Sequence, residues 1–353
     1  MRLLNRYIFR TIFMATIMVL VVIISLDLLA VLIDELGRLS VSYTFFEIVV
    51  YIGLSMPASV YEFMPFAALV GSLAGLGSLA TSNELVIMRA AGISLLIIVW
   101  GVIKPVLIFV IFSILLGEYV IPITNQTAEA RRALLLGKDQ VLESRASLWN
   151  REGNEFMHFN AVQTDGVIYG VTRYQFDNEG VMQSSSFSET AVYQGDYWQE
   201  RNITETTFTT EGTKVQKIAA RDWNNVLSPQ LLNILVLKPD DLAIVNLYTY
   251  SRYLDRQKIS SSQYWLSFWK KLLQPLATIS LVLIAVSFIF GPLREATMGY
   301  RLFAGVIVGI LFQMAQNLLA PASLVYGFPP LIAVVLPIFC CSLWGFLSLR
   351  KVG

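Results

Sequence analysis

The sequence lacks most of what a soluble enzyme needs. Only 14% of its 353 residues are charged and 55% are hydrophobic, which is too apolar for an ordinary soluble protein. Its single histidine, His158, has no cysteine or carboxylate cluster around it, which argues against a zinc site. Its two cysteines, Cys340 and Cys341, are adjacent and cannot staple distant segments together. The net charge of +1 gives no indication of a nucleic-acid partner.

Motifs for ATP binding and for hydrolysis are also missing. The only Gly-Lys pair, Gly137-Lys138, lacks the preceding glycine and the following hydroxyl of a phosphate-binding loop. The patterns HExxH, GxSxG and CxxC do not occur. We therefore expect a non-catalytic chain that binds no cofactor directly. If the protein moves a substrate uphill, the energy must come from a separate ATPase subunit or from ion coupling.

Long apolar runs are what the sequence does contain. A helix that crosses a membrane needs about 20 mostly apolar residues, and six segments qualify: 13–33, 57–80, 95–121, 272–290, 303–320 and 331–349. The apolar residues 44–56 either lengthen the second span or lie along the interface. Two runs with small residues four apart, Gly71–Gly75 and Gly305–Gly309, predict close helix packing.

Positive charge predicts the orientation of the spans, because basic residues favour the cytoplasmic side. With both termini in the cytoplasm, one side collects Arg2, Arg6, Arg10, Arg89, Arg294, Arg301, Arg350 and Lys351. The short loops on the other side carry only Arg38. The middle of the chain holds 14 of the 26 basic and 17 of the 25 acidic residues, counted over residues 122–265. That segment is therefore expected to be the water-exposed domain outside the cytoplasm.

Within this middle segment the pattern changes to strands separated by turns. Residues 156–161, 167–176, 182–192, 198–208 and 214–223 read as strands, which predicts a sandwich or a jelly roll. The predicted fold is a membrane α-helical protein of six helices (3+3) with an inserted extracytoplasmic β-jellyroll domain. Residues 1–121 form the first bundle, with a short helix at 81–92; residues 122–265 form the domain and its linkers; residues 266–353 form the second bundle.

The segment from Thr81 to Gly92 is the first candidate site. Thr81 and Glu84 have the spacing of a capping box, and Gly92 can end a short amphipathic helix. Such a helix could dock on a nucleotide-binding subunit, with Glu84 meeting a basic residue. It could equally be capped by Glu84 and rest on lipid headgroups. The candidate coupling residues are Glu84, Leu85, Ile87, Met88 and Arg89.

The second candidate site is basic charge at the outer membrane edge. Basic side chains there could hold anionic lipid phosphates, or they could snorkel and pair with Asp34, Glu35 or Glu118. The candidate residues are Arg38, Arg131, Arg132, Lys270 and Lys271.

Three further charges, Asp27, Lys104 and Glu62, fall within predicted spans. A charge at the centre of a span costs about 2.5–3.5 kcal/mol, so we expect these side chains to face protein or water. Ion coupling usually needs more intramembrane acids than this, which disfavours a secondary transporter.

Several motifs together resemble the LptF/LptG family of lipopolysaccharide export permeases. They are Arg6-Tyr-Ile, Met64-Pro-Phe-Ala-Ala-Leu-Val-Gly71, Asn83-Glu-Leu-Val-Ile-Met-Arg-Ala-Ala-Gly92, Phe288-Ile-Phe-Gly-Pro-Leu-Arg294, Met298-Gly-Tyr-Arg301 and Leu324-Val-Tyr-Gly-Phe-Pro-Pro330. The resemblance covers both helical bundles. The stretch from Leu324 to Pro330 favours the LptG type over the LptF type.

The resemblance implies a heterodimer with an LptF-like permease, bound to an LptB ATPase dimer that consumes the ATP. The two permeases would enclose a cavity that takes lipopolysaccharide from the outer leaflet of the inner membrane. The cargo would pass to LptC and an LptA-like periplasmic bridge. The resemblance also places Glu84 on the coupling helix and supports Arg38, Arg131 and Arg132 as contacts of the lipid phosphates.

Three other interpretations stay open at this point. The chain could be the LptF-like paralogue, an anchored adaptor or sensor without transport activity, or a lipid-modifying enzyme. Normal lipopolysaccharide delivery after mutation of Glu84 would favour the adaptor. The enzyme would need a catalytic dyad, and Asp27 and Glu62 lack an evident partner.

Overall fold

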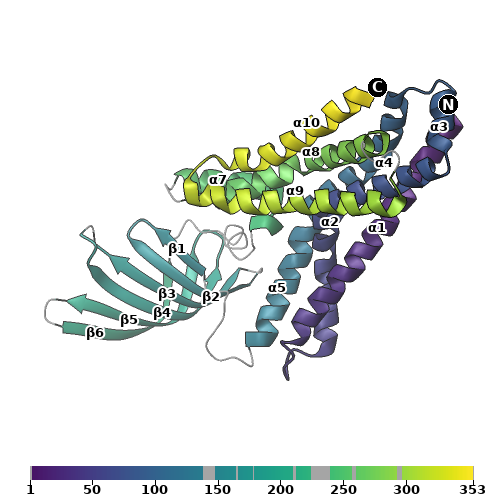
Figure 1. Ribbon diagram of the computed structural model, residues 1–353. Helices are drawn as coiled ribbons and strands as arrows, with labels where there is room; N and C mark the ends of the chain where they lie inside the picture. Colours follow the sequence, from purple (N-terminus) through teal and green to yellow (C-terminus); the bar gives the residue numbers. More distant parts are fainter. Residues whose placement is uncertain are drawn as a thin grey trace. The chain divides into compact units, whose positions relative to one another are not determined.

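The computed structural model describes residues 2–137, 148–163, 166–177, 179–209, 212–223, 239–256, 260–291 and 296–352. The chain forms two compact units (Figure 1). The helical unit contains Met1–Leu39, Thr44–Glu129 and Pro239–Gly353, and the β unit contains Ser40–Tyr43 and Ala130–Lys238. The predicted boundaries at 121/122 and 265/266 stay a prediction; both of them lie inside helices.

Within the described ranges, six helical stretches are long and apolar enough to cross a membrane, which confirms the six predicted spans. Because α2 begins at Phe45, residues 44–56 lengthen the second span. The long helices are α1 (Arg2–Leu36), α2 (Phe45–Thr81), α4 (Leu95–Leu115), α5 (Ile121–Gly137), α8 (Ser262–Phe290), α9 (Met298–Tyr326) and α10 (Pro330–Val352). The short elements are α3 (Glu84–Ala90), the π-helical turn η1 (Leu116–Val120), the 3₁₀ turn η2 (Pro239–Asp241) and α7 (Ile244–Arg256).

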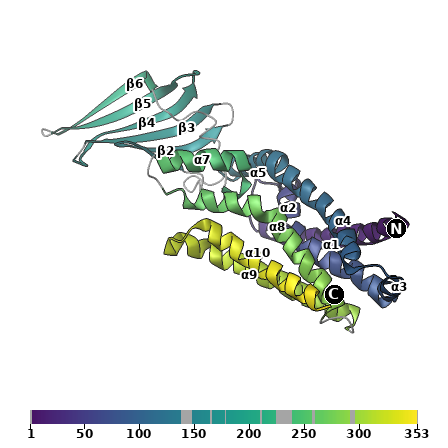
Figure 2. The ribbon, with the colours of Figure 1, turned by 90° about the horizontal axis from the view of Figure 1, so that it is seen from above.

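The helical unit is built around α2 and α8. Helix α2 contacts α1, α4, α8 and α9, and α8 contacts α7 and α10; Figures 1 and 2 both show α7 lying along α8. A large apolar core of this unit includes Ile8, Ile12, Leu73, Leu281 and Phe312. The halves of the chain therefore share one core, because α2 of the first half packs directly on α8 and α9 of the second.

Glycines allow these helices to approach closely. A Cβ added to Gly71 would lie 2.5 Å from the Cα of Thr16, and one added to Gly75 would lie 2.7 Å from the Cδ1 of Ile12, both on α1. A Cβ on Gly305 of α9 would lie 2.1 Å from the Cδ1 of Leu73. The predicted small-residue contacts are thus confirmed, and each of the two motifs serves a different neighbour of α2.

The third span contains a π-helical turn, η1, between α4 and α5. Pro122 has no N–H to donate to the carbonyl of Glu118 four residues earlier, which weakens the α-helical pattern there. Gly117 within the turn packs against Tyr61, since an added Cβ would lie 2.8 Å from its ring. π-helical turns free backbone groups for other partners and are frequent at functional sites.

The described residues of the β unit form one six-stranded antiparallel sheet in which the strands follow their order in the chain. An inserted β domain is thereby confirmed; the described strands make a single sheet where the sequence predicted a sandwich or a jelly roll. The first strand was not predicted, because it is short and carries no alternating pattern. The strands are β1 (Leu148–Glu152), β2 (Glu155–Gln163), β3 (Val167–Phe176), β4 (Met182–Tyr193), β5 (Trp198–Thr209) and β6 (Gly212–Trp223).

Residues with positive φ interrupt two strands of this sheet and affect which side chains are buried. Gly170 of β3 and Asn202 of β5 both have positive φ, 64° and 53°. Along β5 the burial alternation shifts by one residue at this position, so that Glu200 and Ile203 are both buried. Two tryptophans, Trp198 and Trp223, anchor the apolar core that results, together with Met157, Phe159, Ile168, Val171 and Ala191.

Candidate functional site

Helix α3 is the short helix between the second and third spans. It starts after Asn83, which has a left-handed φ of 61°, and it ends where the N–H of Ile93 donates to the carbonyl of Met88. Gly92 has a φ of 80° at this end, so the prediction that Gly92 ends the helix is confirmed. These two sharp ends isolate a helix of seven residues from the spans on either side.

The predicted capping box is wrong. Helix α2 continues through Thr81, whose hydroxyl donates back to the carbonyl of Gly77 at 2.9 Å. Thr81 therefore belongs to the end of one helix and cannot cap the next. The carboxylate of Glu84 instead accepts from the hydroxyl of Tyr7 on α1 at 3.2 Å and lies 2.9 Å from the hydroxyl of Ser82.

The apolar residues of α3 point in two directions. Leu85 and Met88 are 4% and 8% exposed and belong to the core of the helical unit. Val86 and Ile87 are 55% and 64% exposed. The first pair anchors α3 to its own unit, and only the second pair is exposed to a partner; two of the candidate coupling residues, Leu85 and Met88, are therefore buried. Arg89 is exposed at the end of the helix.

At the predicted basic edge, Arg38 is paired with acidic residues. Its guanidinium lies 3.1 Å from Glu35 and 3.5 Å from Asp34. Nearby in the same unit, the hydroxyl of Tyr51 donates to Glu129 at 3.3 Å. Two carboxylates beside one guanidinium leave no local excess of positive charge, which is the pairing that the sequence left open as an alternative.

Lys271 does not lie at an exposed edge. Its side chain is buried, and its ammonium donates to the carbonyl of Leu242 at 2.7 Å and to that of Gly117 at 3.3 Å. The ammonium also lies 5.7 Å from the centre of the Tyr61 ring. Lys271 therefore cross-links these backbone segments, and its assignment as a phosphate ligand stays a prediction.

The spacing of polar residues along α8 could have revealed this role. Ser267, Lys271, Gln274 and Thr278 follow one another at intervals of four, three and four residues, which places them on one face. That face is turned inward, since Ser267 and Thr278 are also buried. Lys270, one residue earlier and about 100° around the helix, is half-buried.

The remaining predicted residues differ in their exposure. Arg131 is exposed and Arg132 half-buried on the part of α5 that belongs to the β unit. In the helical unit Lys104 and Glu62 are exposed and Asp27 is half-buried. The structure brings none of the described acids into a group that could hold a metal ion.

A polar junction around Lys271, which the sequence did not predict, fixes the segment that leads into α8. Glu118 of η1 accepts from the backbone N–H of Ile244 at the start of α7, at 2.8 Å. The amide of Asn125 donates to Asp241 at 2.8 Å, and Ser267 donates to Asp240. These bonds join the third and fourth spans through η2 and α7.

The turn from α7 to α8 has its own polar contacts. Asp255 accepts from the hydroxyl of Ser261 and from the indole N–H of Trp265, the latter at 3.0 Å. These hydrogen bonds, that of Ser261 first, lower the pKa of Asp255. The charged form of this carboxylate therefore stabilises the turn.

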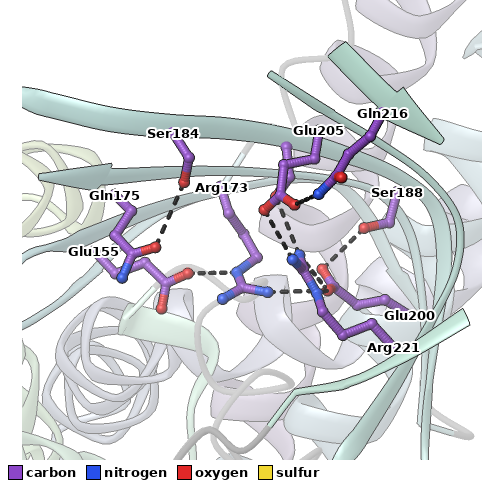
Figure 3. A network of polar contacts seen from close by, with 10 residues as sticks. Glu155, Arg173, Gln175, Ser184, Ser188, Glu200, Glu205, Gln216 and Arg221 are labelled. Atoms are coloured by element: carbon purple, nitrogen blue, oxygen red, sulfur yellow. Dashed lines mark hydrogen bonds and ion pairs between the residues drawn. The ribbon is translucent and has the colours of Figure 1, made fainter. Parts of the chain in front are cut away.

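The β unit contains a network of charged side chains around one buried carboxylate, that of Glu200 (Figure 3). The side chain of Glu200 is fully buried, and it accepts from Arg173 at 2.9 Å, from Arg221 at 2.9 Å and from the hydroxyl of Ser188 at 2.8 Å. Arg221 also pairs with Glu205 at 2.9 Å, and Arg173 pairs with Glu155. Arg173 further lies over the ring of Trp223. Because every carboxylate of the network is engaged by a guanidinium, the arrangement suits a structural clamp.

Two opposing effects act on the pKa values of this network. Burial alone would raise the pKa of Glu205, but hydrogen bonds from Gln216 and Arg221 outweigh it and lower that pKa. Burial alone would lower the pKa of Arg221, but the charge of Glu200 and the bond to Glu205 outweigh it and raise that pKa. Both groups are thus held in their charged forms.

Helices α1 and α9 are covered least by their own chain. In their most apolar stretches only 11% and 17% of the residues are buried, compared with 67% in α2. Their exposed side chains are large and apolar, for example Met18 and Ile33 on α1 and Phe303 and Leu318 on α9. These faces are suited to contact with lipid, with another chain or with an apolar substrate.

Nearly the whole chain is similar to known proteins. The family described as lipopolysaccharide export system permease LptF/LptG matches residues 6–351. The lipopolysaccharide export system permease protein LptG of Escherichia coli (strain K12) is 34% identical over 356 residues, which cover 99% of this chain and 98% of that protein. The LptG of Haemophilus influenzae is 31% identical over 353 residues, which cover 99% of both chains.

Proposed function

The chain belongs to the LptF/LptG family of lipopolysaccharide export permeases, and from this premise we propose how it works. It is a multi-pass inner-membrane protein and the permease subunit of an ATP-driven exporter. Together with an LptF-like permease it extracts lipopolysaccharide from the outer leaflet of the inner membrane. It passes the cargo to LptC and an LptA-like bridge in the periplasm. An LptB dimer binds and hydrolyses the ATP, and this chain binds no cofactor of its own.

The observation that carries the proposal is that α3 has one buried and one exposed apolar face. A seven-residue helix between two spans buries Leu85 and Met88 in its own unit and exposes Val86 and Ile87 next to Glu84. This arrangement supports a rigid contact through which an ATPase can push on the spans. In the proposal, Glu84 meets a basic group of the ATPase while Val86 and Ile87 enter an apolar groove. Arg89 lies at the rim of this contact.

Charge supports the orientation in which both termini and α3 lie in the cytoplasm and the β unit lies in the periplasm. Basic residues flank the spans at the N-terminus, near α3 and at the start of α9, as the rule for cytoplasmic loops requires. Arg6, Arg89 and Arg301 are examples among the described residues.

The weakly covered faces of α1 and α9 support their role as walls of the cargo cavity. Each acyl chain loses about 0.8 kcal/mol per CH₂ if it is moved from lipid into water, so a cavity for lipopolysaccharide must be apolar and open sideways. Six spans with two uncovered helices need a second permease to close such a cavity. The LptF-like subunit would provide the facing wall.

The structure narrows the proposed contacts of the lipid phosphates. Arg38 is paired with Glu35 and Asp34, and Lys271 is bound to two backbone carbonyls. We propose Lys270, Arg131 and Arg132 as the phosphate contacts of this chain, because none of these three side chains is buried.

The test is assembly and ATP-driven release with Glu84→Ala. Losing one partner of a desolvated charge pair costs about 2–5 kcal/mol, so the affinity for the ATPase should fall more than about tenfold. Binding would be measured with the purified ATPase, and lipopolysaccharide release with proteoliposomes that contain the full complex. Glu179→Ala, an exposed glutamate in the β unit, is the control and should behave as wild type. Unchanged assembly and release in Glu84→Ala would overturn the coupling role.

A further inference from the structure

Tyr7 makes the side-chain contact between α1 and the acid of α3. Its hydroxyl donates to Oε1 of Glu84 at 3.2 Å across 77 residues of sequence. The Tyr7 side chain is 46% exposed and lies in the first two turns of α1. A tyrosine hydroxyl that donates to a carboxylate forms a charge-assisted hydrogen bond, which fixes the direction of the acid.

Ser82 is the other hydroxyl at this carboxylate, but it has competing acceptors. Its oxygen lies 2.9 Å from Glu84, 3.1 Å from the carbonyl of Ser78 and 3.3 Å from that of Leu79. A hydroxyl has one proton to donate, so Ser82 divides its bond among these partners. Tyr7 is therefore the more dedicated donor.

The start of α1 is held firmly enough to aim this hydroxyl. Ile8 and Ile12 are fully buried. Gly101 of α4 meets Ile8, since an added Cβ would lie 3.1 Å from its Cγ2, and Gly75 of α2 meets Ile12 in the same way at 2.7 Å. Because α1 is packed against α2 and α4 next to Tyr7, the backbone from which this side chain reaches Glu84 is fixed in place.

We propose that Tyr7 is a positioning residue for Glu84. Its hydrogen bond holds the carboxylate in the orientation that a basic group of the ATPase meets. It also ties α3 to α1, which is one of the two least covered spans, so that displacement of α3 by the ATPase reaches α1 directly. This role rests on the proposed function and adds a link between the ATPase contact and a wall of the cavity.

The experiment compares Tyr7→Phe with Tyr300→Phe in the complete complex. Tyr300 is an exposed tyrosine near the start of α9 and provides a matched loss of a hydroxyl. Tyr7→Phe should weaken binding of the ATPase dimer about three- to tenfold, the size expected for one hydrogen bond. It should also lower the amount of lipopolysaccharide released per ATP, while Tyr300→Phe leaves both unchanged.

A double-mutant cycle with Glu84→Ala distinguishes positioning from general stability. If Tyr7 acts through the carboxylate, Tyr7→Phe lowers the affinity in the Glu84 chain and has no further effect in the Glu84→Ala chain. An equal loss in both backgrounds, or Tyr7→Phe behaving as Tyr300→Phe, would overturn the positioning role while the coupling function stands. If Glu84→Ala itself has no effect, the proposed function fails first.

Discussion

The buried cations of the helical unit and the buried Glu200 of the β unit are satisfied in different ways. In the helical unit, buried cations donate to backbone carbonyls: Lys271 to those of Gly117 and Leu242, and Arg301 to that of Gly77. In the β unit, the buried Glu200 is bound by the side chains of Arg173 and Arg221. A span offers mainly backbone acceptors, freed at turns and helix ends, whereas a sheet brings side chains from neighbouring strands onto one face.

The units also differ in what sets the distance between their elements. Helices of the helical unit approach until a glycine contacts a neighbouring helix, as Gly71 of α2 contacts the backbone of Thr16 on α1. Strands of the β unit lie at the fixed spacing of the hydrogen-bonded ladder, so their side chains must fill the space on the faces of the sheet. A change of volume should therefore damage the helical unit most, and a change of charge the β unit most.

The largest effect is expected from Glu200→Ala. Removing the one fully buried carboxylate leaves two guanidiniums without their shared partner, which typically costs about 3–5 kcal/mol. The loss should be confined to the β unit and appear as faster amide hydrogen exchange in β3, β5 and β6 of the full-length protein. Glu189→Ala, an exposed acid on β4 that accepts only from Asn202 among the bonds described, should change exchange little. Equal exchange in both variants would refute the view of the network as a clamp.

A loss of stability nearly as large is expected when a single methyl group is added in the helical unit. In Gly71→Ala the new Cβ would lie 2.5 Å from the Cα of Thr16 and 2.9 Å from its nitrogen. Backbone cannot move aside as a flexible side chain can, so we expect a destabilisation of about 3 kcal/mol. Gly53→Ala on the same helix, where no atom lies within 4 Å of the new Cβ, should be neutral or slightly stabilising. The check is thermal unfolding of the two purified variants in detergent; matching midpoints would contradict the close contact.

The sequence predicted the parts of the fold that depend on the length of apolar segments and on the alternation of apolar and polar residues. Six spans follow from apolar length, and five strands follow from alternation between turns. The strand β1 was missed because its five residues include Arg151 and Glu152 and show no apolar alternation. The shift of burial at Asn202 was also out of reach, since it depends on a backbone conformation and not on a residue pattern.

The candidate site was predictable only in part, because it depends on which way side chains point. Lys270 and Lys271 look alike in the sequence, yet adjacent helix positions face directions about 100° apart, and only Lys271 is inside. Leu85 and Ile87 likewise share a pattern while one is buried and the other exposed. The bond from Tyr7 to Glu84 joins residues 77 positions apart, and nothing local indicates it.

A smaller effect is expected from replacing the buried cation of the helical unit. Lys271→Met keeps the volume but leaves the carbonyls of Gly117 and Leu242 without the ammonium, a loss of about 2 kcal/mol. Because these carbonyls hold η1 and the lead into α7, amide exchange should rise in residues 239–247 and around 117. Lys270→Met provides the control for loss of a charge at the neighbouring position. If both variants exchange alike, Lys271 is not the cross-link between these segments.

The smallest loss of stability is expected at low pH, in an exposed turn of the β unit. Asp177 accepts from the backbone N–H of Val181 and of Glu179 at 2.9 Å each, and from the side chain of Gln183 at 2.7 Å. These bonds, that of Val181 first, lower the pKa of Asp177.

A carboxylate with a lowered pKa in the folded state contributes stability above its unfolded pKa of about 3.9, and this contribution is lost as the pH falls through the lower folded value. Protection of the β3–β4 turn against hydrogen exchange, corrected for the intrinsic pH dependence, should therefore fall below about pH 4. Asp177→Asn should remove that pH dependence, because an amide does not titrate there, whereas Asp196→Asn in the β4–β5 turn should leave it in place. A wild-type turn whose protection stays constant down to pH 2.5, about 1.4 units below the reference value, would show that the charge of Asp177 does not stabilise it. Among the described residues of the β unit, stabilisation by charge would then be expected from the network around Glu200, which would sharpen the contrast with the helical unit, where the buried cations Lys271 and Arg301 donate to backbone carbonyls.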